Sequence, residues 1–311
     1  FDRRRFLQLT TDGLADQPLL RRLRRTSEAC RATLPPDYVA ALAILRRIAP
    51  RLEHNFVSLF TCDFVGLYGH DHFALSMEAL HHLTRFGSAE FAIREFLRRD
   101  LPRTLAVMKQ WSLDGNEHVR RLASEGCRPR LPWSFRLTAL VADPTPALPI
   151  LENLRADPSL YVRKSVANHL NDISKDHPDW LFEVTAAWPQ DNPRTAWILR
   201  RGLRTLVKRG HPQALAAIGA SRDPAARITG FRLAPRRVTL GGEVNFSFRL
   251  ESRAKAAQRL VVDFVVHYVK QSGATAPKVF KLKEVTLAGG SAVALAKRLR
   301  LADLSTRRHH P

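Results

Sequence analysis

The chain has 311 residues, of which 50 are Lys or Arg and 29 are Asp or Glu, so its formal net charge is +21 at pH 7. Hydrophobic residues make up 45%, which suffices for a buried core and argues against a wholly disordered chain. No apolar run approaches the roughly 20 residues that a membrane-spanning helix needs, which excludes a transmembrane protein. The length indicates two domains. A charge this large favours nucleic acid as a partner; the alternative is an arginine-rich but ordinary solvated surface.

The three cysteines, Cys30, Cys62 and Cys127, lie far apart and form no Cys-x-x-Cys pair. An odd number of cysteines without such spacing predicts neither a disulfide framework nor a zinc site. The histidines show no paired metal-ligand spacing either. We therefore expect a cytoplasmic protein that needs no metal and no cofactor.

Most of the first 220 residues show the apolar spacing of amphipathic helices, separated by prolines and by Asp-Gly or Asp-Pro pairs. The expected helices span residues 38–48, 76–86, 88–97, 103–111, 117–124, 146–154, 161–173, 179–188 and 194–207. Ser88 precedes one of them and is a candidate N-cap, because its hydroxyl can accept a bond from a free amide of the first turn.

Three of these helices share a motif in which an aliphatic residue is followed by two basic residues. The motif occupies residues 119–123, 162–166 and 199–203, and a further helix fits before each copy. A period near 40 residues with two helices per unit is typical of HEAT-like repeats, which stack into a solenoid with a concave surface. The repeated cations would form a stripe on that surface. Chance similarity between amphipathic helices is the alternative.

The pattern changes near Arg227, where alternation typical of strands begins. Residues 244–250 and 260–266 alternate in this way, 278–287 and 292–301 are further strand candidates, and Gly-containing pairs supply turns between them. We predict a mainly α protein with a helical domain over residues 1–226, followed by a small antiparallel β-sandwich, Ig-like in type, over residues 227–311. The second domain carries about half of the net charge, so we expect it to contact the polyanion too.

Two segments are unusual for a purely structural repeat. Residues 116–133 place Arg-Pro-Arg-Leu-Pro-Trp after a helix, and residues 161–178 combine a basic pair with Asn, His and Asp. Both closely resemble the AlkC branch of the HEAT-like DNA alkylation-repair glycosylases, and residues 88–94, 203–208 and 304–309 are similar to the same family. The resemblance covers nearly the whole chain. Family members are expected to begin upstream of Phe1 and to continue beyond His309.

The resemblance implies a DNA glycosylase that excises cationic N-alkylated bases, particularly 3-methyladenine and 3-methylcytosine, in base-excision repair. We expect it to be monofunctional, because no lysine stands out in the sequence as a nucleophile. It implies that the helical domain holds double-stranded DNA and that the Ig-like domain closes on it; we expect a monomer. The chemistry is consistent with this, because a base alkylated on a ring nitrogen leaves as a neutral molecule. An oxocarbenium-like sugar and a water then remain to be stabilised and positioned, and a carboxylate can do both.

Glu117 and Glu152 are the predicted catalytic carboxylates. Glu117 opens the helix with the first basic pair, Glu152 lies in the first helix of the next repeat, and stacking could bring both to one groove. The alternatives are that Glu117 only stabilises a helix N-terminus and that Glu152 is a solvated charge paired with Arg155. Asp157 and Asp172 are reserve candidates.

The predicted DNA-binding residues are mostly the repeated cations, since phosphate contacts position a duplex without reading its sequence. They are Arg120, Arg121, Arg128, Arg130, Trp133, Arg163, Lys164, Asn168, Arg200, Arg201, Arg204, Lys208, Arg236 and Arg237. About half of the cations are expected to reach DNA, because neighbouring helical residues diverge by about 100°. A Trp in a solenoid is normally core, and Trp133 is the expected exception that stacks on the lesion or its sugar.

Two other functions fit the same composition. A non-catalytic HEAT scaffold would bind nucleic acid without releasing a base, and a protein-interaction repeat would bind DNA weakly with little dependence on salt. The sequence leaves open whether the damaged base is flipped into a pocket or exposed by a kink in the duplex.

Overall fold

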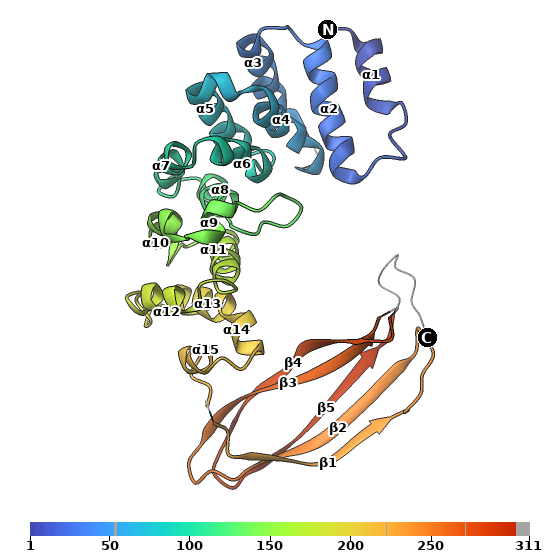
Figure 1. Cartoon of the computed structure of the whole chain (residues 1–311), viewed down its shortest axis with the longest axis vertical. Coiled ribbons are helices and arrows are strands. Elements are labelled where there is room, and N and C mark those ends of the chain that lie inside the picture. The colour runs from blue at the N-terminus through green and yellow to red at the C-terminus, as the bar shows by residue number, and fades with distance from the viewer. Residues whose placement is uncertain (53–54, 222, 271, 303–311) are drawn as a thin grey trace. The chain divides into compact units, whose positions relative to one another are not determined.

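A computed structural model describes residues 1–52, 55–221, 223–270 and 272–302. The chain divides into two compact units, Phe1–Thr205 and Leu206–Pro311. The first unit is a stack of helices and the second carries the strands (Figure 1). The predicted order of a helical domain followed by an antiparallel β domain is confirmed. Within the part that is described, none of the helices is both long and apolar enough to cross a membrane.

The helical unit consists of two layers of helices. Its helices are α1 (Arg3–Thr11), α2 (Leu19–Thr33), α3 (Tyr38–Ile48), α4 (Asn55–Tyr68), α5 (Phe73–Leu83), α6 (Glu90–Arg99), α7 (Leu101–Trp111), α8 (Glu117–Gly126), α9 (Thr138–Ala142), α10 (Leu148–Leu154), α11 (Leu160–Ile173), α12 (Pro178–Ala186) and α13 (Pro193–Gly202). Helices α2, α4, α6, α8, α11 and α13 pack side by side in what we call the inner layer. Helices α3, α5, α7, α10 and α12 form the outer layer (Figure 1).

The pairs α7–α8, α10–α11 and α12–α13 are the three predicted repeats. Their inner helices begin in the same way, because Asn116, Ser159 and Asn192 each accept a bond from the backbone amide two residues later. Such N-caps satisfy amides that have no partner inside the helix. The aliphatic residue of each motif is buried (Val119, Val162 and Leu199), so the repeat reflects equivalent packing rather than chance.

Two helix predictions were wrong in detail. Ser88 is not an N-cap: α6 begins at Glu90 after Ala89, and the Ser88 hydroxyl instead accepts a hydrogen bond from Arg121. The single helix expected over 194–207 is two helices, because α13 ends at Gly202 and α14 (Arg204–Lys208) follows. The Leu203 amide donates to the Leu199 carbonyl, which closes the last turn of α13.

The described residues of the second unit form a short helix and five strands. They are α15 (Pro212–Ala217), β1 (Ala226–Ala234), β2 (Glu243–Ser252), β3 (Gln258–Val269), β4 (Thr275–Leu287) and β5 (Ala292–Arg300). One antiparallel sheet has the order β1-β2-β5, and the other pairs β3 with β4. Both sheets contribute to one core, which includes Phe246 and Leu250 from the first and Leu260 from the second. The alternation predicted for residues 244–250 is therefore confirmed, and β1 is a strand that was not predicted.

The boundary between the units precedes the predicted one at 226/227. The segment after α13 joins the strands through hydrogen bonds: the Ser221 amide donates to the Arg259 carbonyl at 2.9 Å, and the Lys208 amine donates to the Val279 carbonyl at 3.3 Å. Lys208, expected to bind DNA, thus also holds α14 against β4. These contacts are between segments far apart in the chain, which a change of local pattern at Arg227 does not reveal.

The thiols of Cys30, Cys62 and Cys127 are free and buried. Burial raises the pKa of each thiol to about 12, because a thiolate is poorly solvated there. All three therefore stay protonated and pack as small apolar side chains.

His169 of α11 generates a prediction about acid stability. Its ring is fully buried, Nδ1 donates to the Ser124 carbonyl at 3.1 Å, and Nε2 has no hydrogen-bond partner in the described residues. Burial lowers the pKa of His169 from 6.5 to about 4. The unfolded chain therefore binds a proton between these values that the folded chain does not, so stability present above pH 6.5 is lost as the pH falls toward 4.

We expect roughly 3 kcal/mol of unfolding free energy to be lost over this range because of His169. His169→Asn keeps a donor for the Ser124 carbonyl and should flatten the profile, although it lowers stability at pH 7. Urea unfolding at pH 7, 5.5 and 4.5 measures this, with the exposed His72→Asn as the control. If the unfolding free energy of His169→Asn depended on pH as steeply as that of wild type, His169 would not be the source of the acid destabilisation.

Candidate active site

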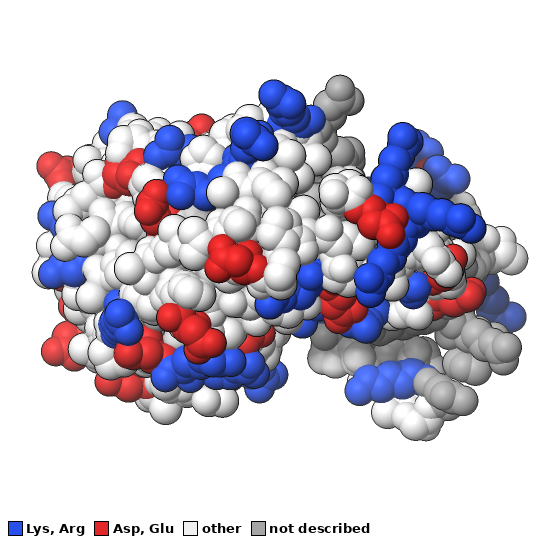
Figure 2. Space-filling view, turned by 90° about the horizontal axis from the view of Figure 1, so that it is seen from above, with Lys and Arg blue, Asp and Glu red and all other residues white. Residues whose placement is uncertain are grey.

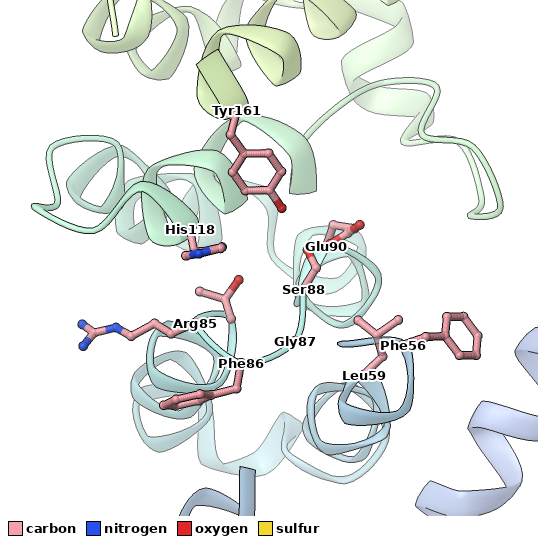
Figure 3. Close-up of a pocket in the computed structure, with 10 residues that line it drawn as sticks. Phe56, Leu59, Arg85, Phe86, Gly87, Ser88, Glu90, His118 and Tyr161 are labelled. Carbon is pink, nitrogen blue, oxygen red and sulfur yellow. The ribbon is translucent and has the colours of Figure 1, made fainter. Parts of the chain in front are cut away.

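A cavity of about 280 Å³ opens at the inner layer, where α4, the segment before α6, α8 and α11 meet (Figure 3). It is lined by Phe56, Leu59, Thr84, Arg85, Phe86, Gly87, Ser88, Glu90, His118 and Tyr161. Apolar rings form one part of the lining, and a carboxylate, an imidazole and a phenol form another. This combination can accept a flat aromatic molecule and orient it by a few polar contacts.

Tyr161 is the aromatic side chain through which α11 reaches the cavity. Its hydroxyl points into the cavity on the side of Glu90 (Figure 3). The Arg121 guanidinium lies over the Tyr161 ring, 5.1 Å from its centroid, and forms an ion pair with Glu90 at 3.0 Å. Burial raises the pKa of Tyr161, so its hydroxyl is a hydrogen-bond donor at neutral pH.

Glu117 and His118 connect the first turns of α8 and α11 beside the cavity. The Ser159 hydroxyl donates a short hydrogen bond to the Glu117 carboxylate, and the rings of His118 and Tyr161 meet edge to face with centroids 5.5 Å apart. Glu117 is exposed and, among the described residues, forms no ion pair. Its carboxylate therefore lies where solvent or a ligand can reach it, without a described cation beside it.

Beneath this surface, charges of alternating sign run through the inner layer. Arg121 lies between Glu90 at 3.0 Å and Glu125 at 3.5 Å, and Arg128 lies between Glu125 at 2.7 Å and Asp172 at 2.9 Å. We call these five residues the charge chain. Burial opposes the charge on both guanidinium groups, but the neighbouring carboxylates outweigh it and raise their pKa values. The charge chain ties α6, α8 and α11 together.

The second predicted carboxylate stands apart from the first. Glu152 is exposed on α10 of the outer layer, whereas Glu117 is bonded to Ser159 within the inner layer. In the alternative interpretation Glu152 would pair with Arg155; among the described interactions the Arg155 guanidinium instead donates to the Glu152 backbone carbonyl at 2.8 Å. No described interaction joins Glu152 to the cavity.

The two reserve carboxylates are buried and paired. Asp157 accepts both bonds of a bidentate contact from Arg120, at 2.7 and 3.1 Å, and Asp172 binds Arg128 and Lys175. Each therefore has a structural partner, and neither lies open to a ligand.

The first cation of the motif has an internal role in two repeats. Arg120 donates to the carbonyls of Asp114 and Gly115, both at 3.0 Å, and Arg163 donates to those of Asp157 and Pro158, both at 2.8 Å. Both residues thus fix the loop before their own helix. All three guanidinium nitrogens of Arg120 have partners, because Nε and Nη2 bind Asp157, whereas Arg163 uses only Nη1 for its two carbonyls. That Arg120 and Arg163 bind phosphate stays a prediction.

The other predicted cations vary in exposure. Lys164, Arg200 and Arg201 are exposed on the inner layer, and Arg236 and Arg237 are exposed after β1. Arg204 is half-buried and donates to Asn168 at 3.1 Å, which makes Asn168 a repeat-packing residue. In Figure 2, cations and carboxylates lie interspersed on the visible surface, so the positive charge is not one uniform field.

The loop after α8 contains the remaining predicted residues. Arg128 is buried in the charge chain, and Arg130 forms a bidentate pair with Asp176 at 2.7 and 2.8 Å. Neither guanidinium is free for phosphate in this structure. Trp133 is 70% exposed, whereas Trp111 and Trp188 are buried, as is usual for a tryptophan in a helical solenoid.

Sequence reasoning missed Glu90 and Glu125 as members of the site. Both lie in segments that resemble the family, and both are acids in a strongly basic chain, which was the available signal. Tyr161 also lines the cavity and was not among the predicted site residues. In the described ranges, no group of three or more His, Cys, Asp or Glu side chains could hold a metal ion.

Comparison with known proteins agrees with this architecture over both units. A family model described as DNA alkylation repair enzyme matches residues 83–206, and one described as the C-terminal Ig-like domain of uncharacterised protein YhaZ matches residues 227–311. The uncharacterized protein YhaZ of Bacillus subtilis (strain 168) is 41% identical over 311 residues, which are 100% of this chain and 86% of that protein.

A solved structure extends the comparison to three dimensions. The alkylpurine DNA glycosylase AlkC of Pseudomonas fluorescens, bound to DNA containing an abasic site analog, is 51% identical with a TM-score of 0.96. The match covers 100% of this chain and 87% of that one. The chain therefore belongs to the family of DNA alkylation repair enzymes, in the AlkC branch that its motifs indicated.

Proposed function

We propose that the protein is a monofunctional DNA glycosylase that hydrolyses the N-glycosidic bond of cationic N-alkylated bases, such as 3-methyladenine and 3-methylcytosine, in double-stranded DNA. In this reaction the bond between C1′ and the base breaks, and its electron pair leaves with the base, which becomes neutral. Water adds to C1′ and loses a proton. We expect the protein to act as a monomer in the cytoplasm without a cofactor.

One observation supports this proposal above the others: Glu117, the neighbour in sequence of the cavity-lining residue His118, is a carboxylate whose contact partner is neutral. Glu90, Glu125, Asp157 and Asp172 each lie within ion-pair distance of an arginine, which cancels much of their field. Glu117 instead accepts from the Ser159 hydroxyl, which fixes its orientation and leaves its charge in place. A preoriented charge of this kind stabilises an opposite charge that develops in the transition state.

Glu117 is accordingly the carboxylate proposed to stabilise the oxocarbenium-like sugar and to orient the water. Glu152 remains the second proposed carboxylate. Because it lies on the outer-layer helix α10, this role requires that the DNA reach α10. Tyr161 and His118 offer the damaged base a phenol donor and an aromatic edge across the cavity.

We expect Glu117→Gln to reduce single-turnover release of 3-methyladenine on the order of 100-fold or more, because the amide has the same shape without the charge. Affinity for a duplex with an abasic-site analogue should change by no more than about threefold, since phosphate contacts dominate binding. Chromatography of the freed base and fluorescence anisotropy measure the two quantities.

The controls separate the candidate carboxylates. Glu152→Gln should also lose turnover, whereas Glu183→Gln, an exposed acid of the outer helix α12, should behave as wild type. Full activity in both Glu117→Gln and Glu152→Gln would refute the site assignment. A wild-type protein that binds DNA but releases no base would instead identify a non-catalytic scaffold.

The exposed cations of the inner layer yield a second prediction. Lys164→Gln and Arg201→Gln should each weaken DNA binding and reduce the slope of log affinity against log salt by about 1. Anisotropy titrations between 50 and 200 mM salt measure this. Lys109→Gln, an exposed cation of the outer helix α7, is the matched control, and an equal effect there would contradict a directed contact.

A further inference from the structure

Arg94, in the middle of α6, is a buried cation that holds the loop between α8 and α9 from inside the helical stack. Its side chain is fully buried, and no carboxylate of the described residues lies within ion-pair distance of it. Burial lowers the pKa of Arg94 only to about 10, so the guanidinium is charged at neutral pH. Removing such a group from water is costly unless hydrogen bonds replace the lost solvent.

The two terminal nitrogens of Arg94 bind different arms of the loop. Nη1 donates to the carbonyls of Gly126 at 3.0 Å and Arg128 at 2.7 Å, on the arm that leaves α8. Nη2 donates a short hydrogen bond to the Phe135 carbonyl, on the arm that returns toward α9. Nε has no hydrogen-bond partner in the part of the chain that is described. One planar fork therefore spans both arms, which the single nitrogen of a lysine could not do.

Contacts at its base also impose the conformation of the rest of the loop. The Arg98 guanidinium lies over the Phe135 ring, 4.9 Å from its centroid, and the Leu137 amide donates to the Pro129 carbonyl at 3.1 Å. Figure 1 shows the loop projecting from the side of the inner layer. Within it, Trp133 has a φ of 65°, the only left-handed value of a non-glycine residue in the described ranges. Such strain persists only where the surroundings impose it.

The first arm of the loop also belongs to the charge chain. Arg128, whose carbonyl accepts from Arg94, binds Glu125 at 2.7 Å and Asp172 at 2.9 Å through its guanidinium. A displacement of the Arg128 backbone would therefore disturb one end of the charge chain. Arg94 thus links the conformation of the loop to the charged residues beneath the cavity.

We propose that Arg94 is a positioning residue for base excision, which fixes the loop between α8 and α9 in the conformation with which the protein engages a damaged duplex. The inference rests on the proposed glycosylase function for the reaction that the loop serves. Groups that meet a ligand in one geometry act best when neighbouring contacts have fixed them beforehand. Arg94 provides this from the core and through backbone carbonyls, so its role is separate from that of the side chains at the tip of the loop.

The test uses Arg94→Lys, which keeps the charge but replaces the fork by one nitrogen. Hydrogen exchange of the amides in residues 130–137 should become about 10-fold faster or more, because hydrogen bonds from a charged group are lost. Single-turnover excision of 3-methyladenine should fall about 10- to 100-fold, since a displacement of about 1 Å can have an effect of this size. Affinity for undamaged duplex should change by no more than about threefold, because phosphate contacts dominate it.

Two other variants complete the test. Arg24→Lys removes an equivalent fork from the pair that Arg24 of α2 forms with Asp63 of α4, and it should change neither excision nor exchange in the loop. Arg98→Gln removes a guanidinium whose side chain is 60% exposed, so the core stays intact. It should speed exchange in the second arm and lower excision less than Arg94→Lys does.

Each result supports or overturns the proposal. Faster exchange in the loop of Arg94→Lys with wild-type excision would overturn it, as would slower excision without faster exchange. If Arg94→Lys does not fold, wild-type exchange and excision in Arg98→Gln would overturn it instead. If the wild-type protein releases no base, the glycosylase proposal fails. Exchange and the preference for a duplex with an abasic-site analogue over undamaged duplex then decide: wild-type values in Arg94→Lys contradict the role of Arg94, and faster exchange with a lost preference supports it.

Discussion

The helical unit depends on cations and carboxylates that neutralise one another inside the inner layer. The charge chain alternates in sign from Glu90 to Asp172 across three helices, and each member has its partner within 3.5 Å. Removing one member would leave an unpaired buried charge, which typically costs about 3–5 kcal/mol. The charge chain contains three carboxylates and two arginines, so the positive excess of the protein comes entirely from residues that do not belong to the charge chain.

The repeated basic pair divides between two roles because neighbouring helical residues point in different directions. Arg120 and Arg163 bind the carbonyls of the preceding loop and so fix the connection between the two helices of their own repeat, while the contact of Arg120 with Asp157 joins one repeat to the next. Of the second cations, Lys164 and Arg201 are exposed, whereas Arg121 is paired within the charge chain. Periodicity in a solenoid therefore identifies equivalent positions, and contacts with the neighbouring repeat decide which positions face solvent.

The sequence predicted what depends on local pattern. Apolar spacing located the repeats, alternation located the strands around Phe246, and the motifs indicated the family. The placement of Glu90 against Arg121 could not be predicted in this way, because the two residues are 31 positions apart and meet only when α6 packs on α8. The position of Glu152 could not be predicted fully either. The sequence placed it in the first helix of a repeat, but only the packing of the helices shows that this helix, α10, belongs to the outer layer.

The position of the charge chain beneath the cavity bears on the proposed reaction. The alkylated base begins as a cation and leaves neutral, while the positive charge moves to the sugar. Arg121 lies over one face of Tyr161, and Glu90 and Glu125 neutralise its charge. Glu117 lies one turn earlier on α8, with an exposed carboxylate that no described cation pairs with. Catalysis requires stronger stabilisation of the transition state than of the substrate, and in the proposed reaction the Glu117 carboxylate meets that requirement because positive charge develops on the sugar as the bond breaks.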